Sequence, residues 1–392
     1  MAFLSGTVSF SRHHVAGGAP KRLDDRLLEK LREHRIGTQR VMRADHEEVG
    51  WIGGRHLLDG EFDIEKNVLL DCLHCGLRID VSKIPPERLR AYVQMELDEL
   101  RRKNGNGHAP GRIKREAVEA ARRRADEEIK KGRYRRQRQA PVLLDSRNDV
   151  LFLGETRPTA LQRVSSLFKE TVGKRLEPMT AGYLAYAWAE RAGLTRMLEG
   201  LEPAPFVRGD GDNGRAEVCW TASDPTSRDY LGNEFLLWLW FTLSERGDTI
   251  ALPDNTDAAV VMVKQLVLEC PRAEMGRQTI ACDGPTQLPE SRRAVQSGKL
   301  PRKAGLIVSR QGAQYEFLLQ AETFNVTSAV LPKIDAGGNG NGRGRAFAEE
   351  RIEQIRHLAE TVDLLFAVFL KLRLSSAWPA ELAAVRAWLS GE

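Results

Sequence analysis

Cysteine is scarce in this sequence, and its few positions do not form the pattern of a disulfide framework. The chain of 392 residues has five cysteines, an odd number, scattered along its length. They are Cys72, Cys75, Cys219, Cys270 and Cys282. Disulfide-rich secreted domains are short and carry an even number of closely spaced cysteines. We therefore expect the protein to work in a reducing compartment.

Long apolar runs are also missing. No stretch reaches the roughly 18 uninterrupted apolar residues of a membrane-spanning helix. The opening segment MAFLSGTVSFSRHH has no basic stretch followed by an apolar one, so it does not match a secretion signal. The sequence predicts no membrane association, and we expect a cytoplasmic protein.

The sequence has no complete motif for a nucleotide or a structural metal. Its glycine-rich segments lack the G-K-[ST] ending of a phosphate-binding loop. The segment CLHC, with Cys72, His74 and Cys75, has zinc-knuckle spacing, but no second ligand pair completes four ligands. We interpret these cysteines as buried structural thiols and expect neither a metal nor a cofactor.

One acidic run leaves an enzymatic alternative open. In DGEFDIE, acidic residues alternate along what reads as an extended chain, at Asp59, Glu61, Asp63 and Glu65. Carboxylates on one side of a chain could bind a divalent ion for phosphodiester hydrolysis. Such alternation is more often a solvated strand face or a turn, so a non-enzymatic protein is the main expectation.

Apolar residues are plentiful enough for a sizeable core. They make up 42% of the chain, and aromatic residues make up 7%. Strand-like runs are mixed with helical periodicities along the chain, which predicts an α+β fold. The segment EFLLWLWF contains Phe235, Trp238, Leu239 and Trp240 and reads as core, with a subunit interface as the alternative.

Two helical segments predict a hairpin. PPERLRAYVQMELDELRRK begins with prolines suited to a first helical turn. NGNGHAPGR interrupts this helix, and a second helix follows from about residue 113 to 131. Its predicted packing face consists mostly of small residues, which let a neighbouring helix approach closely. These residues are Ile113, Ala117, Val118, Ala120, Ala121, Ala125 and Ile129.

Shifts in composition divide the chain into parts. We expect an N-terminal α/β region (1–84 with 140–202), a helical hairpin with a basic tip (85–139), a loop or boundary (203–228), a second α/β region (229–334), a glycine-rich linker (335–346) and C-terminal helices (347–392).

Positive charge is concentrated in the hairpin region. The chain has 59 Lys/Arg and 54 Asp/Glu, for a net charge of +5. Residues 101–138 hold 15 Lys/Arg and 5 Asp/Glu, which leaves 59 − 15 = 44 against 54 − 5 = 49 elsewhere. Within the second helix, pairs four residues apart, such as Glu119 with Arg123, explain much of the charge without a ligand. One region, and not the whole molecule, is suited to a polyanion.

The cations that follow this helix have no acidic neighbour between Ile129 and Leu144. Tyr134, Gln137 and Gln139 lie among them, as suits contacts that position a nucleic-acid backbone without reading its bases. A solvated charged loop is the alternative. The candidate DNA-binding residues here are Lys130, Lys131, Arg133, Tyr134, Arg135, Arg136 and Arg138.

The order of these segments resembles the recombination-associated protein RdgC family. The resemblance is carried by VGWIGG, NVLLDCLHCGLRIDVSKIPPERLRAYVQMELDELRRK, GRYRRQRQAPVLLDSRNDVLFLGET and RRAVQSGKLPRKAGLIVSRQGAQYEFLLQAETF. It implies an elongated mixed α/β subunit with a projecting helical hairpin, and a dimer closed into a ring around duplex DNA. It also implies that the protein restrains the RecA recombinase by competing for DNA. The loop at 203–228, the glycine-rich linker and the C-terminal helices look like additions to the family pattern.

The resemblance also suggests where two parts of this chain would act. It places the segment 132–139 at a tip near the ring closure, with Tyr134 at the position of an apolar aromatic. Thr286 and Gln287 fall near a polar DNA-facing stretch.

We therefore expect a sequence-independent double-stranded DNA-binding protein, associated with the nucleoid and acting as a homodimer. The alternatives are a metal-dependent nuclease using Asp59, Glu61 and Asp63, and an RNA-binding regulator using the same basic segment.

Overall fold

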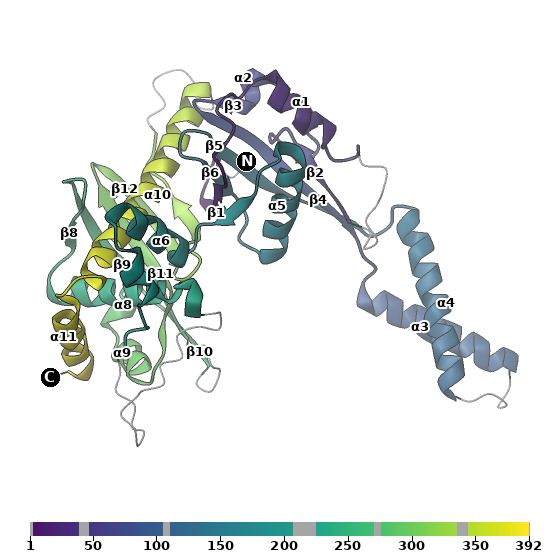
Figure 1. Ribbon diagram of the computed structural model, residues 1–392. Helices are drawn as coiled ribbons and strands as arrows, with labels where there is room; N and C mark the ends of the chain where they lie inside the picture. Colours follow the sequence, from purple (N-terminus) through teal and green to yellow (C-terminus); the bar gives the residue numbers. More distant parts are fainter. Residues whose placement is uncertain are drawn as a thin grey trace.

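The structure, a computed structural model, describes residues 3–38, 47–104, 110–206, 225–269, 276–334 and 344–391. It has a mixed α+β fold, so the fold class predicted from the sequence is confirmed. Figure 1 shows a body made of two sheet-and-helix halves and a helical hairpin that projects from one of them.

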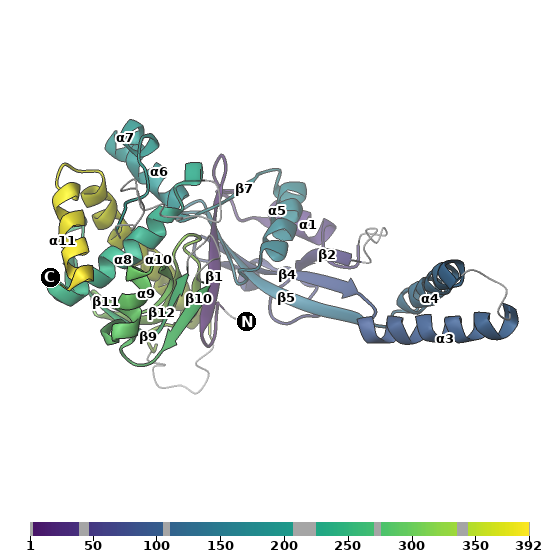
Figure 2. The same ribbon diagram turned by 90° about the horizontal axis from the view of Figure 1, so that it is seen from below.

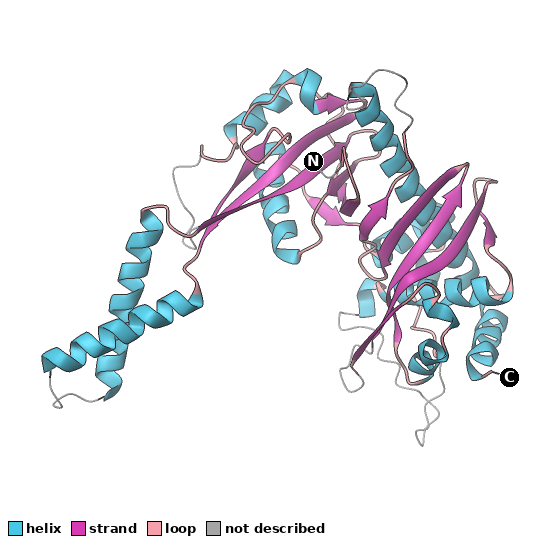
Figure 3. Ribbon diagram, turned by 180° about the vertical axis from the view of Figure 1, so that it is seen from behind, coloured by secondary structure: helices cyan, strands magenta, loops and turns pink. Residues whose placement is uncertain are grey.

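The N-terminal half is an antiparallel sheet with two helices on one face (Figure 3). Its strands are β1 (Val8–Val15), β2 (Glu47–Ile52), β3 (Val68–Leu69), β4 (Cys72–Ser82), β5 (Arg135–Asp145), β6 (Val150–Leu153) and β7 (Leu176–Pro178). The helices are α1 (Asp25–Glu33) and α5 (Pro158–Val172), with the short α2 (Ile64–Asn67) before β3. Leu28 of α1, Trp51 of β2 and Phe168 of α5 meet in the core between sheet and helices. The Trp51 indole also donates a hydrogen bond of 2.8 Å to the Thr171 hydroxyl of α5.

The second half packs another antiparallel group of strands against a buried helix, α8 (Tyr230–Glu245). The strands are β8 (Thr249–Ala251), β9 (Asp257–Glu269), β10 (Arg277–Ala281), β11 (Leu300–Arg310), β12 (Ala313–Gln320) and β13 (Val326–Val330). Its other helices are α6 (Ala181–Ala192), α7 (Thr195–Glu199), α9 (Pro289–Gln296) and α11 (Trp378–Ser390).

Helix α8 is buried on every side. Each residue from Tyr230 to Thr242 is buried, as expected for a helix that is apolar all round. The core interpretation of EFLLWLWF is therefore confirmed. The subunit-interface alternative is wrong for Phe235, Trp238 and Trp240, because their own chain already covers them.

The two groups of strands join through β1. The strand order is β10-β9-β11-β12-β13-β1-β6-β5-β4-β2. The first part of β1, at Val8 and Phe10, pairs with β13, and its second part, from Ser11 to His14, pairs with β6. The backbone hydrogen-bond network is therefore continuous from one half to the other.

Helix α10 (Arg345–Arg373) braces the two halves along its length (Figure 1). Arg356 forms an ion pair of 2.8 Å with Asp145 of β5, and Asp363 forms one of 2.7 Å with Arg12 of β1. At its other end, Arg373 binds Glu234 of α8 at 2.7 Å. The C-terminal helices look like additions when the sequence is set against the family that it resembles. In the structure they are part of the core.

The projecting hairpin consists of α3 (Pro86–Asn104) and α4 (Pro110–Lys130), as predicted. Figure 2 shows it extending from the end of the ribbon formed by β4 and β5. The predicted small-residue face of α4 packs on α3, with Ala117, Ala121 and Ala125 fully or almost fully buried. Because alanine has a small side chain, the two helices can lie close together along this face.

Two predicted segments fall largely outside the described residues. In the boundary at 203–228, residues 207–224 are outside, and Pro225–Ser227 form a single 3-10 turn. In the glycine-rich linker at 335–346, residues 335–343 are outside, and α10 begins at Arg345.

Candidate nucleic-acid interface

The basic segment 132–139 lies at the root of the hairpin, and the expectation of a basic tip is wrong in this respect. Gly132 and Tyr134 adopt left-handed backbone angles, with φ of 79° and 63°, and turn the chain from α4 into β5. From Arg135 onward the segment is a strand that pairs with β4, starting with Arg135 opposite Ser82. All 11 residues of β5 pair with β4, so the sheet extends as far as the hairpin root.

Tyr134 is occupied in a polar cluster that ties this turn to the hairpin. Its hydroxyl donates a hydrogen bond of 2.6 Å to Glu128, which also accepts one of 2.9 Å from Tyr92 of α3. The hydrogen bond from Tyr134, followed by that from Tyr92, holds the pKa of Glu128 below its usual value. The same bond is the main cause that raises the pKa of Tyr134 to about 12. Arg88 lies over the rings of both tyrosines.

Arg133 shares this cluster, with its guanidinium 3.1 Å from Glu128. Tyr134 is half-buried at the hairpin root and is not the free apolar tip that the resemblance implied.

The pleat of β5 sends its arginines to two different faces. Arg135 lies on one face, where its guanidinium is 2.6 Å from Asp80 and 3.0 Å from Glu48. Burial alone would raise the pKa of Asp80, but hydrogen bonds from Arg78 and Arg135 outweigh burial and lower it. Gln137 also donates to Asp80, at 3.3 Å. Two of the arginines that lack acidic neighbours in sequence, Arg133 and Arg135, therefore have acidic partners in space.

Arg136 and Arg138 lie on the opposite face and line a groove of about 450 Å³. The groove runs between the β4–β5 ribbon and the beginning of α5, and Lys83 lies at its hairpin end. Side chains of Ile79 and Val81 form its apolar floor.

Three cations of this groove have no ion pair among the described residues. The two acidic residues that line it, Glu47 and Glu155, are each bound by an arginine of the α5 region, Arg163 and Arg157 respectively. The three unpaired and exposed cations are Lys83, Arg136 and Arg138. The groove thus offers an anion three free positive side chains on one face.

The remaining predicted residues lie apart from this groove. Lys130, in the last turn of α4, and Lys131, directly after it, are both exposed at the hairpin root. Thr286 and Gln287 lie in the second half, just before α9, and line a separate cavity. Figure 1 shows α9 and the hairpin on different parts of the molecule, so these two residues do not join the basic segment.

The acidic run that suggested a nuclease is used in local structure. Asp59 is buried, 3.0 Å from Lys66, and accepts hydrogen bonds from the backbone of Arg55 and Glu61. Burial would raise the pKa of Asp59, but these bonds outweigh it and lower the pKa. Asp63 caps α2. Asp59 is thus held in an ion pair, and one oxygen of Asp63 is used by the helix cap.

Cys72 and Cys75 are buried, which confirms their interpretation as interior thiols. Side chains alternate along β4, so Cys72 and His74 point to one face of the sheet and Cys75 to the other. These residues cannot surround one ion. No group of metal-ligating side chains occurs in the part of the chain that the structure describes.

No protein-family model matches this chain, and no curated protein matches it either. Of the helices in the described ranges, none is long and apolar enough to cross a membrane.

Sequence reasoning missed three groove residues: Lys83, Arg157 and Arg163. Strand alternation could have separated Arg136 and Arg138 from Arg135, because residues two apart share a face. No local signal shows that α5 lies beside them, since α5 follows β5 and β6 in the chain.

Proposed function

We propose that this protein binds double-stranded DNA without sequence preference, along the groove at the hairpin root and the charged surface of the hairpin. The observation that carries the proposal is the gathering of Lys83, Arg136 and Arg138 on one face, while both acidic residues of the groove already have arginine partners. Phosphate oxygens form strong charge-assisted hydrogen bonds with such unpaired cations.

A structural explanation for the arginines of β5 also exists. Residues 135–141 pair with β4 on one side, and β6 pairs with β5 only from Val142. Charged side chains on such an edge strand prevent pairing with another molecule. Edge protection does not require Lys83 to share the face of Arg136 and Arg138, so anion binding accounts for more of the arrangement.

Lack of sequence preference follows from the kind of contact. Long, exposed arginine and lysine side chains reach phosphates, which carry no base information. The hairpin adds a reach of about 30 Å, since α4 has 21 residues.

The finer part of the proposal rests on the RdgC resemblance. It holds that two subunits close into a ring around the duplex, on the nucleoid, and that the protein restrains RecA by occupying DNA. A projecting arm is compatible with a subunit that encloses a duplex together with its partner.

Fluorescence anisotropy with labelled duplexes of unrelated sequence tests the main proposal. We expect equal affinities for these duplexes and a steep loss of affinity with salt. Supercoiled plasmid incubated with Mg²⁺ or Mn²⁺ should shift in a gel but remain uncut. Plasmid cleavage would support the nuclease instead, and stronger competition by RNA than by duplex DNA would support an RNA-binding regulator.

The oligomeric state needs a separate measurement. Light scattering of the free protein and of its DNA complex should give the mass of a dimer. A monomer under both conditions would rule out the ring and leave DNA binding itself intact.

A further inference from the structure

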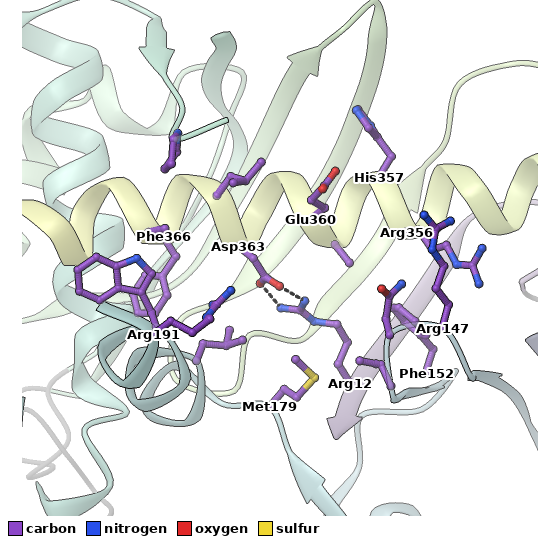
Figure 4. Close-up of a pocket in the computed structure, with 18 of the residues that line it drawn as sticks. Arg12, Arg147, Phe152, Met179, Arg191, Arg356, His357, Glu360, Asp363 and Phe366 are labelled. Carbon is purple, nitrogen blue, oxygen red and sulfur yellow. Dashed lines mark hydrogen bonds and ion pairs between the residues drawn. The ribbon is translucent and has the colours of Figure 1, made fainter. Parts of the chain in front are cut away.

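Another cavity, of about 770 Å³, lies where the two halves meet (Figure 4). Its lining comes from β1, the turn between β5 and β6, α6 and α10. The volume lies within the usual range for sites that enclose small organic ligands. The groove proposed for DNA shares none of its lining residues.

The carboxylates on the cavity wall already have partners. Asp363 is held by both terminal nitrogens of Arg12, each at 2.7 Å. Glu353 is bound by Arg356 at 2.6 Å, and Glu360 by Arg310 at 2.9 Å. Each of these carboxylates therefore already has a guanidinium partner that offsets its charge, although Glu353 and Glu360 stay about half exposed.

Free donors remain on two sides of the Arg12–Asp363 pair. Arg191 extends toward this pair from α6, and Arg147 lies on the other side, in the turn after β5 (Figure 4). Both side chains are exposed and have no ion pair within the described ranges. Arg12 is 5% exposed, and its Nε is buried without a hydrogen-bond partner in the described structure. Two exposed arginines without ion pairs thus flank the buried Arg12–Asp363 pair. The Nε of Arg191 donates a hydrogen bond of 3.1 Å to the Ala187 carbonyl, so its terminal nitrogens are the donors left for a ligand.

Most of the remaining lining is apolar and partly aromatic, together with Asn148 and His357. Phe152, Met179, Leu184, Trp188 and Leu364 contribute to it. Aromatic rings bind the flat faces of nucleobases by stacking, and a guanidinium binds a phosphate through two parallel hydrogen bonds. We infer that this cavity binds a nucleoside phosphate, with the base against the apolar wall and the phosphate at the exposed arginines, Arg191 and Arg147, that flank the Arg12–Asp363 pair.

Other small anions fit the cavity less well. A long-chain carboxylate needs an extended apolar channel, whereas four arginines, from β1, the β5–β6 turn, α6 and α10, interrupt the apolar surface here. Inorganic phosphate would leave most of the volume and all of the aromatic surface unused. The nucleoside phosphate could be a free nucleotide or the terminal nucleotide of a strand, since both present the same groups.

Isothermal titration calorimetry of the full-length protein with AMP, ATP and inorganic phosphate tests the inference. We expect both nucleotides to bind more tightly than inorganic phosphate. Arg147→Ala and Arg191→Ala should each weaken AMP binding about tenfold or more, because each removes a charge-assisted hydrogen bond. Arg196→Ala is the matched control, since this exposed arginine of α7 is not in the lining, and it should leave affinity unchanged.

A second arm uses a single-stranded oligonucleotide with a 5′ phosphate. Because the DNA groove can also bind this strand, its binding is assigned to the cavity only if both Arg191→Ala and removal of the 5′ phosphate weaken it. AMP binding without such an effect assigns free nucleotides alone to the cavity. Each variant should keep the parent melting temperature, because the substituted side chains are exposed. The inference is overturned if AMP does not bind, if inorganic phosphate binds equally well, or if both arginine variants retain full AMP affinity.

Discussion

The two pairs of arginines at the hairpin root allow a direct test of the DNA site. Arg136 and Arg138 have no acidic partner among the described residues, whereas Arg133 binds Glu128 and Arg135 binds Asp80. We compare two double variants. The first carries Arg136→Gln and Arg138→Gln, and the second carries Arg133→Gln and Arg135→Gln. Both proteins lose two positive charges from the same six-residue stretch, Arg133 to Arg138, so net charge and overall field change equally.

The expected magnitude follows from counterion release. Each phosphate contact contributes about 0.9 to the slope of log K against log salt on duplex DNA. Loss of Arg136 and Arg138 should therefore lower that slope by up to about 1.8 per subunit. The corresponding loss of affinity is about 60-fold at 0.1 M salt and falls to about 20-fold at 0.2 M. The Arg133 and Arg135 variant should change the slope much less, because these guanidinium groups are already paired with carboxylates.

Anisotropy titrations at several salt concentrations, with two duplexes of unrelated sequence, measure both slopes. Glutamine keeps the edge strand polar, so aggregation should not mask the comparison. Equal slope changes in the two variants would refute the groove, because they would mean that net charge matters and position does not. A loss confined to one of the two sequences would refute phosphate contact as the mechanism.

Three further predictions concern the fold. Glu128→Gln should bring the pKa of Tyr134 down from about 12 toward its ordinary value, as followed by NMR of labelled tyrosine rings, because the hydrogen bond to the carboxylate is the main cause of the shift; an unchanged titration would contradict that cause. Burial lowers the pKa of His13 and His74 to about 4, so the folded state excludes their protons and stability falls as pH drops below about 6.5. Each histidine should lower the free energy of unfolding by about 2 kcal/mol by pH 5. Urea unfolding of His13→Gln should therefore show a weaker pH dependence than that of the parent. Arg373→Met should destabilise the protein by about 3–5 kcal/mol in the same assay, because it leaves a fully buried carboxylate without its partner; a loss below about 1 kcal/mol would contradict the bracing role of α10.

Local periodicity was sufficient to predict many of the elements. The alanines of α4 recur at helical spacing, and the same residues are buried against α3. The all-apolar segment around Trp238 is a buried helix, as a helix without a polar face must be. The hairpin between β5 and β6 also follows from strand-like runs on both sides of a polar turn.

The ion pairs of the basic segment could not be predicted in the same way. Its cations lack acidic neighbours in sequence, but Asp80 lies 55 positions before Arg135, and Glu48 lies 87 positions before it. Only the register of β4 with β5 and β2 with β4 brings these groups together. Sequence-local counting of charge therefore overestimates the number of free cations and misses Lys83, which shares a face with Arg136.

The strands that carry the groove also connect it to the centre of the molecule. At one end of the β4–β5 ribbon, Ser82 faces Arg135 beside the hairpin root, and at the other end Cys72 faces Asp145. Arg356 of α10 binds Asp145 there and contacts the Cys72 sulfur at 3.2 Å. An unbroken ladder of 11 paired residues, about 35 Å long, thus runs from the hairpin root to the brace between the two halves. Because Arg136 and Arg138 stand on this ladder and not on a loop, DNA would meet them in fixed positions, and a change in salt slope would report phosphate contacts without a folding step.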